Sequence, residues 1–129
     1  MPKSEISRRS GLSSQTVSVI MRSLEKDGLL LRGEPQRGKV GQPSIPMRLD
    51  PNGVFSLGLK IGRRSADLIL VDFLGQERKA VSKIFDYPLP SELLEFAKNS
   101  IGEFLQYLSS DEQKRIAGVG VSMPFELWN

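Results

Sequence analysis

The residues best suited to chemistry gather in a short polar cluster near the start of the chain. Residues 13–18 read Ser-Ser-Gln-Thr-Val-Ser, and an arginine follows at position 22. Hydroxyl, amide and guanidinium groups donate and accept hydrogen bonds, and they can contact base edges in the major groove of DNA. The candidate DNA-contacting residues of this cluster are Ser13, Ser14, Gln15, Thr16, Ser18 and Arg22.

Composition restricts other kinds of chemistry. The 129-residue chain has no Cys and no His, which excludes disulfides and thiolate metal sites and removes the commonest general base. Catalysis would have to use carboxylates, hydroxyls or lysines, and we predict no catalytic residue, metal ligand or cofactor in this chain. No apolar run is long enough to span a membrane, and the first residues lack the apolar core of a secretory signal. We therefore expect a soluble, cytoplasmic protein that does not contact a membrane.

A helix must position the polar cluster, and the flanking sequence predicts one. Gly11 suits the left-handed position that ends a preceding helix, expected over residues 3–10, and Ser13 can cap the next helix. Only Ile6 and Leu12 can pack inward from the region before Ser13. Apolar residues then recur at the i, i+3, i+4, i+7 spacing of a helix with one buried face, at Val17, Ile20, Met21 and Leu24. This order is typical of a helix-turn-helix, and an ordinary amphipathic surface helix is the alternative.

A basic hairpin is expected to follow the two helices. Residues 29–32 predict a short apolar strand, and residues 44–49 predict the returning strand. The connecting residues 33–43 are rich in Gly and Pro and carry the basic side chains Arg37 and Lys39. Two helices followed by a β-hairpin form a winged helix, in which Arg37 and Lys39 would contact phosphates or the minor groove. A solvated loop is the alternative.

The charge distribution divides the chain into two units. Residues 1–50 contain nine Lys and Arg against five Asp and Glu, whereas residues 51–129 contain nine against ten. The basic excess therefore lies in the first unit, which favours a polyanionic partner for that unit. We expect two domains. Residues 1–50 form a winged helix-turn-helix with only a few residues for the further helix that normally precedes the pair, and residues 51–129 form the second domain.

The second unit begins with a strand pattern. Three strands are expected over residues 54–61, 66–73 and 77–85, joined by turns into an antiparallel meander. The third strand is expected to alternate charged residues with the apolar Ala80, Val81 and Ile84. After a helix and the polar loop 109–114, a buried apolar strand is expected from residue 116, parallel to the strand it rejoins. The helix, capped by Ser91, should have an apolar face made of Leu93, Leu94, Ala97, Ile101, Phe104, Leu105 and Leu108.

Four segments together carry a family resemblance. They are G-L-S-S-Q-T-V-S-V-I-M-R-S-L-E-K-D-G-L-L from Gly11, G-K-V-G-Q-P-S-I-P from Gly38, L-G-L-K-I-G-R-R-S-A-D-L-I-L-V-D-F-L-G from Leu57 and I-A-G-V-G-V-S-M-P from Ile116. In this order the chain resembles the regulator branch of the ROK family, which comprises repressors, open reading frames and sugar kinases. The resemblance implies an α+β chain of two units, a winged helix-turn-helix followed by the first β-β-β-α-β portion of an actin-like (ribonuclease-H-like) ATPase-fold domain.

The same resemblance implies partners. Regulators of this family bind double-stranded DNA and respond to a sugar or sugar phosphate, and we expect a homo-oligomer because one short recognition helix reads few base pairs. Family members continue into a second lobe with a sugar pocket and often a Cys-rich zinc motif, so the resemblance implies that this chain is a fragment and that any zinc site lies outside it.

Two departures from the family pattern bear on function. ROK kinases have an acidic residue and then Gly-Gly-Thr in the first phosphate-binding turn, where this chain has Lys60, Gly62, Arg63 and Arg64. A cation there repels magnesium, so we expect a regulator without kinase activity; these basic groups could instead bind an anionic effector or be solvated. Family regulators often have Gly-Arg-Pro in the wing, where this chain has Gly41, Gln42 and Pro43. Gln42 is therefore a further candidate for DNA contact, and Arg37 or Lys39 would supply the missing charge.

Two other functions compete with the DNA-binding regulator. A sugar kinase with an incidental extension is disfavoured by Lys60 and by the lack of Gly-Gly-Thr. A purely structural interaction module is disfavoured by the basic excess and the predicted wing.

Overall fold

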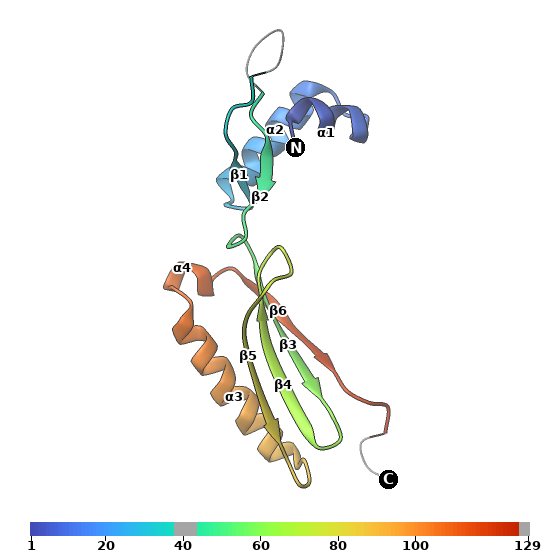
Figure 1. Ribbon diagram of the computed structural model, residues 1–129, viewed down its shortest axis with the longest axis vertical. Helices are drawn as coiled ribbons and strands as arrows, with labels where there is room; N and C mark the ends of the chain where they lie inside the picture. Colours follow the sequence, from blue (N-terminus) through green and yellow to red (C-terminus); the bar gives the residue numbers. More distant parts are fainter. Residues whose placement is uncertain (38–43, 127–129) are drawn as a thin grey trace. The chain divides into compact units, whose positions relative to one another are not determined.

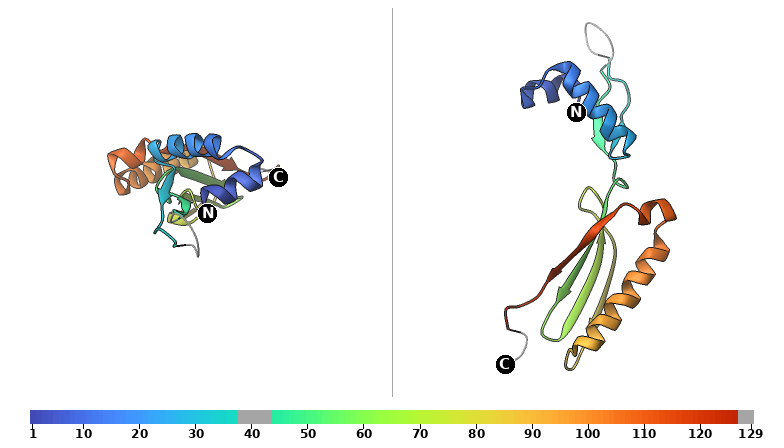
Figure 2. Two further views of the ribbon diagram at one scale, coloured as in Figure 1. Left: turned by 90° about the horizontal axis from the view of Figure 1, so that it is seen from above. Right: turned by 180° about the vertical axis from the view of Figure 1, so that it is seen from behind.

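The computed structural model describes residues 1–37 and 44–126. The chain divides into two compact units, Met1–Gly53 and Val54–Asn129, each with its own apolar core. Figures 1 and 2 show helices and a small hairpin in the first unit and a sheet with a long helix in the second.

Two helices and a two-stranded hairpin make up the first unit. They are α1 (Lys3–Ser10), α2 (Ser14–Lys26), β1 (Leu30–Arg32) and β2 (Met47–Leu49). The two strands pair antiparallel, with Leu30 opposite Leu49 and Arg32 opposite Met47. The core comprises Val17, Met21, Leu30 and Met47, with Ile6 and Leu24 packed against it.

Two expected core residues of the first unit are exposed instead. Leu12 lies in the turn between the helices, where its carbonyl accepts a hydrogen bond from Ser7 Oγ at 2.6 Å. Ile20 is exposed although it belongs to the predicted apolar stripe. Around a helix Ile20 lies about 100° from Met21, so a hairpin that covers Met21 and Val17 does not reach it.

Backbone hydrogen bonds extend the hairpin beyond the two short strands. Gly33 N–H donates to Pro46 O at 2.8 Å, and Gln36 and Ser44 exchange two bonds of 2.8 and 3.0 Å. On the other edge of β2, Met47 N–H donates to Met1 O at 2.8 Å. The expected hairpin is therefore present, and its paired strands continue to Gln36 before the connecting residues.

The second unit is a four-stranded sheet with one long helix (Figure 1). Its strand order is β5-β4-β3-β6, in which β3, β4 and β5 pair antiparallel and β6 pairs parallel to β3. The expected meander and parallel strand are confirmed. The elements are β3 (Phe55–Ile61), β4 (Ser65–Val71), β5 (Glu77–Ile84), α3 (Pro90–Tyr107), α4 (Ser110–Gln113) and β6 (Ile116–Ser122).

The core of the second unit lies between α3 and one face of the sheet, as Figure 2 shows from behind. Phe85 and Phe96 meet edge to face, with ring centroids 6.2 Å apart, a favoured aromatic geometry. The remaining core residues are Phe55, Leu57, Ala66, Leu68, Leu70, Phe104 and Leu108.

Several details of the second unit differ from the sequence prediction. Ile84 is 83% exposed, because it lies on the same face of β5 as Ser82, opposite the face that α3 covers. Helix α3 begins at Pro90 after Leu89, so Ser91 does not cap it, and Leu94 is exposed while Phe96 is buried. The loop expected over residues 109–114 contains the short helix α4, which is capped by Ser109.

Strand β6 is parallel as expected but not buried. Val119 and Val121 are exposed, because α3 packs on β4 and β5 and, in the part of the chain that is described, β6 pairs with β3 alone. From Ala117 to Ser122 both faces of this strand are therefore uncovered in the described part of the chain.

A buried carboxylate organises the turn between β4 and β5. Asp72 accepts hydrogen bonds from the backbone N–H groups of Leu74 at 2.9 Å and Gln76 at 3.0 Å, and it forms an ion pair with Arg78 at 2.8 Å. The Arg78 hydrogen bond, more than the two backbone donors, holds the pKa of Asp72 below its ordinary value. The Arg78 guanidinium also lies 5.9 Å from the centre of the Phe55 ring, so the turn is tied to the core.

Candidate nucleic-acid interface

A tight turn fixes how α2 follows α1. Gly11 adopts a left-handed conformation with φ of 72°, and its N–H donates to Ser7 O at 3.0 Å. Glycine reaches this conformation without the steric cost that a side chain would add. Ser10 Oγ then accepts from Leu12 N–H at 3.3 Å, so short polar contacts hold the connection.

Ser13 and Thr16 together form the start of α2. Ser13 Oγ accepts a hydrogen bond from Thr16 N–H at 3.2 Å, and the two hydroxyl oxygens lie 2.8 Å apart. This is the N-cap contact expected of Ser13. The bond between the two hydroxyls also helps to fix the first turn of the helix.

The other candidate residues of the polar cluster share one shallow depression on the exposed side of α2. Ser14, Gln15, Ser18 and Arg22 line it together with a residue that the sequence analysis missed, Val19. Val19 is 64% exposed although it is apolar and β-branched. The helical spacing already contained this signal, because Gln15, Val19 and Arg22 follow each other at i, i+4 and i+7.

The opposite face of α2 is anchored in the unit. Val17 and Met21 are buried against the hairpin, and Glu25 near the end of α2 accepts two hydrogen bonds from Arg32 of β1, at 2.6 and 3.1 Å. The Arg32 hydrogen bond, with a smaller effect from the charge of Lys3, lowers the pKa of Glu25. A helix held along one face in this way presents the other face in a fixed orientation.

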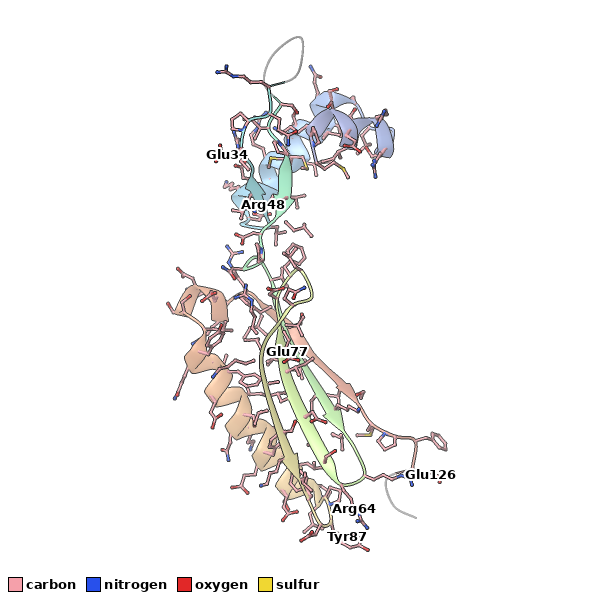
Figure 3. All side chains as sticks on the ribbon, viewed as in Figure 1. Glu34, Arg48, Arg64, Glu77, Tyr87 and Glu126 are labelled. Carbon is pink, nitrogen blue, oxygen red and sulfur yellow. The ribbon has the colours of Figure 1, made fainter. Side chains whose placement is uncertain are left out.

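The hairpin carries basic residues next to this helix in the same unit. Arg37 is exposed and directly follows Gln36, which is paired with Ser44. Arg48 on β2 is also exposed, and Figure 3 labels it on the hairpin. The candidates Lys39 and Gln42 lie outside the described residues.

The turn that carries Gly62, Arg63 and Arg64 lies between β3 and β4. Gly62 N–H donates to Ser65 O at 2.7 Å, and a side chain at Gly62 would meet Ser65 Oγ at 2.9 Å, so the turn is tight. Arg63 and Arg64 are exposed on it (Figure 3). Lys60 lies at the end of β3 on the sheet face away from α3.

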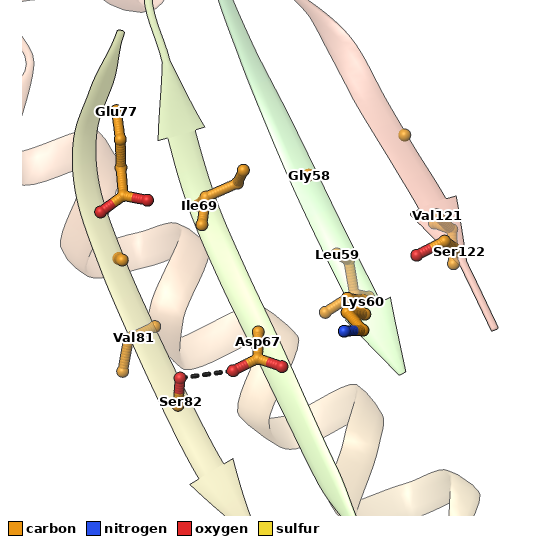
Figure 4. Close-up of a pocket in the computed structure, with 12 residues that line it drawn as sticks. Gly58, Leu59, Lys60, Asp67, Ile69, Glu77, Val81, Ser82, Val121 and Ser122 are labelled. Atoms are coloured by element: carbon orange, nitrogen blue, oxygen red, sulfur yellow. Dashed lines mark hydrogen bonds between the residues drawn. The ribbon is translucent and has the colours of Figure 1, made fainter. Parts of the chain in front are cut away.

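Lys60 has a carboxylate as its cross-strand neighbour. It lies opposite Asp67 of β4 and opposite Ser122 of β6, and all three line a shallow hollow on the open face of the sheet (Figure 4). Asp67 in turn accepts a hydrogen bond from Ser82 of β5. Opposite charges in such cross-strand positions stabilise a sheet modestly when they meet, and the sequence alone did not reveal this register.

Two kinds of arrangement are absent from residues 1–37 and 44–126. No group of three or more acidic side chains is arranged there to hold a metal ion. No helix within these ranges is both long and apolar enough to cross a membrane.

Comparison with known proteins agrees with this geometry. Residues 1–30 match the family described as winged helix-turn-helix DNA-binding. Over 96% of its length the chain superposes on 31% of a crystal structure described as a ROK family transcriptional regulator, homolog of the E. coli MLC protein, with a TM-score of 0.67 and 19% identity. The chain shares the fold of this ROK regulator. The fold class expected from the sequence, a winged helix-turn-helix followed by the start of an actin-like domain, is confirmed.

A curated relative extends over the same part of the chain. It is the uncharacterized protein y4fQ of Sinorhizobium fredii (strain NBRC 101917 / NGR234), which is 26% identical over 120 residues, or 93% of this chain. The chain spans 30% of that relative and 31% of the ROK regulator, so both proteins are about three times as long.

Proposed function

We propose that this protein is a sequence-specific, DNA-binding transcriptional regulator of the ROK family. The observation that carries the proposal is helix α2, which is buried along Val17 and Met21, while Ser14, Gln15, Ser18 and Arg22 line a depression on its surface. A helix anchored along one face, with hydrogen-bonding groups in its first turns on the other, suits docking into the major groove of double-stranded DNA. The match of residues 1–30 to a winged helix-turn-helix DNA-binding family supports the same function.

The two candidate contact regions have different roles in this proposal. Ser14, Gln15 and Ser18 contact base edges, and the amide of Gln15 suits a bidentate contact with adenine. Arg22 and Arg37 contact phosphates or the minor groove, where charge increases affinity with little sequence preference. Lys39 and Gln42, which lie outside the described residues, belong to the second group.

The second unit belongs to the sensing part of the protein in this proposal. By its resemblance to ROK regulators, the whole protein binds a sugar or sugar phosphate, and that binding changes its affinity for DNA. The protein acts as a homo-oligomer, since two half-sites give the selectivity that one short helix lacks. It does not phosphorylate sugars, because Lys60 stands where the resemblance expects an acidic group near magnesium.

Selection from a random duplex library tests DNA binding. The full-length protein should enrich a defined sequence, and its affinity for that sequence should fall steeply with salt. Gln15→Ala should relax the preference at one base position, whereas Ser23→Ala, on the same helix but outside the depression, should keep it. No enrichment of any sequence by the full-length protein would refute the proposed function.

Two separate assays test the other parts of the proposal. Titration of the selected DNA complex with a panel of hexoses, amino sugars and their phosphates should identify a compound that changes the affinity. Incubation with magnesium, ATP and the same sugars should give no sugar-dependent release of ADP. Sugar-dependent ADP release would show that Lys60 does not prevent phosphoryl transfer.

A further inference from the structure

The depression on α2 combines polar groups with one exposed apolar side chain. Val19 lies between Gln15, four residues before it, and Arg22, three residues after it, and all three line the depression. Its exposed fraction of 64% contrasts with 2% for Val17, two residues earlier on the same helix. Val19 therefore contributes nothing substantial to the core of the first unit, and its apolar surface is available to a ligand.

We infer that Val19 is a specificity-determining residue that contacts the 5-methyl group of a thymine. This inference rests on the proposed function, since it assigns one base to a residue of the DNA-binding face. Among the base edges in the major groove, thymine alone presents a methyl group, and apolar side chains recognise it by contact. The Gln15 and Arg22 side chains on either side of Val19 offer hydrogen bonds but no methyl group.

The position of Val19 also restricts where this thymine lies. Four residues of helix rise by about 6 Å, which is close to the spacing of two base pairs along the DNA axis at about 3.4 Å each. Because Gln15 suits adenine, the recognised sequence should contain an adenine contacted by Gln15 and, within about two base pairs, the thymine contacted by Val19.

Replacing thymine by uracil in the selected duplex tests the contact, because uracil pairs like thymine but lacks the methyl group. Burial of one methyl group corresponds to about a fourfold change in affinity. We expect one position at which uracil weakens binding of the wild-type protein by about fourfold. Val19→Ala should weaken binding to the thymine duplex by a similar factor, and it should bind the uracil duplex and the thymine duplex equally at that position.

Ile20→Ala is the matched control. Ile20 is the neighbouring exposed apolar residue of α2 but does not line the depression, so this variant should keep the wild-type sensitivity to uracil. Circular dichroism and binding to random DNA at low salt verify that each variant is folded.

Each result has a definite meaning. If a sequence is selected but no single uracil weakens the wild-type protein, the inference is wrong while the proposed function stands. The inference is also wrong if Val19→Ala loses affinity but stays as sensitive to uracil as the wild type, because Val19 then acts elsewhere, for example against a second protein. If no sequence is selected at all, the proposed function fails.

Discussion

Two valines of α2 allow the effect of burial on stability to be separated from the other effects of a valine-to-alanine substitution. Val17 is 2% exposed in the core of the first unit, and Val19 is 64% exposed on the opposite side. We predict that Val17→Ala destabilises this unit and that Val19→Ala does not. Both variants lose the same two methyl groups from the same helix, so their difference in stability measures the burial of Val17.

The magnitude follows from the structure. Loss of two buried methyl groups costs about 1.6 kcal/mol in transfer free energy, and the cavity among Met21, Leu30 and Met47 raises this to roughly 2 kcal/mol. Alanine favours a helix over valine by a few tenths of a kcal/mol, but this gain is common to both variants. A unit of this size has a free energy of unfolding of roughly 3–8 kcal/mol. Val17→Ala should therefore remove a quarter or more of it.

Amide hydrogen exchange on the whole chain measures this effect in the first unit. A difference of about 2 kcal/mol corresponds to exchange about thirtyfold faster in Val17→Ala than in Val19→Ala for amides of α2 that open by unfolding of the unit. Amides of β4 belong to the other core and serve as an internal reference. Equal exchange in α2 for both variants would refute the assignment of Val17 to the core and, with it, the orientation of the candidate DNA-binding face.

Three further predictions concern individual contacts. Gln15→Ala should cost about 1–3 kcal/mol on the selected DNA and relax one base position, as measured by competition with single-base variants; equal losses on selected and random DNA would exclude a base contact. Arg37→Ala and Lys39→Ala together should lower the slope of log affinity against log salt by about one unit for each phosphate that the variant no longer neutralises, and an unchanged slope would assign the hairpin tip to solvent. Because Arg78 lowers the pKa of Asp72, the stability that Asp72 contributes is complete above its unfolded-state pKa of about 3.9 and is lost as pH falls through the lower folded-state value. Asp72→Asn should remove this acid-range component from the pH dependence of unfolding, and an unaltered dependence would contradict the ion pair.

Local signals in the sequence were sufficient to predict most of the structure of the first unit. Gly11, Ser13 and the spacing of Val17, Met21 and Leu24 each act within one or two helical turns, and the structure agrees with all of them. Ile20 was assigned wrongly because a helical period gives the direction of an apolar face but not its width. That width depends on how far the packed hairpin extends around the helix, which is a tertiary property.

The same limit explains why Val19 was missed. A valine among polar residues of a helix contributes little to the periodic pattern, so the pattern of apolar residues assigned no role to Val19. Its spacing from Gln15 and Arg22 already placed it on their face, and the burial of Val17 and Met21 shows that this face points away from the core. In a DNA-binding helix such a position matters because bases differ in apolar as well as in polar groups.

The strand topology of the second unit could be predicted from the sequence, but the burial of its residues could not. The apolar character of residues 116–121 indicated a strand parallel to β3, which is correct, because the helix before it forces a crossover. It also indicated burial on both faces, which is wrong for the part of the chain that is described. Whether a strand is covered depends on neighbouring elements, and the strand's own residues contain no information about their presence.

The register of the sheet changes how the chemistry of Lys60 is interpreted. From sequence alone it is a cation at a phosphate-binding turn, where it could repel magnesium or attract an anion. The register of β3 and β4 sets Asp67 directly across from it, and Asp67 also accepts a hydrogen bond from Ser82. A cation opposite a carboxylate attracts phosphate less strongly, and a carboxylate opposite a cation binds magnesium less strongly. The register therefore brings a carboxylate across from Lys60, which weakens the anion-binding interpretation of this turn.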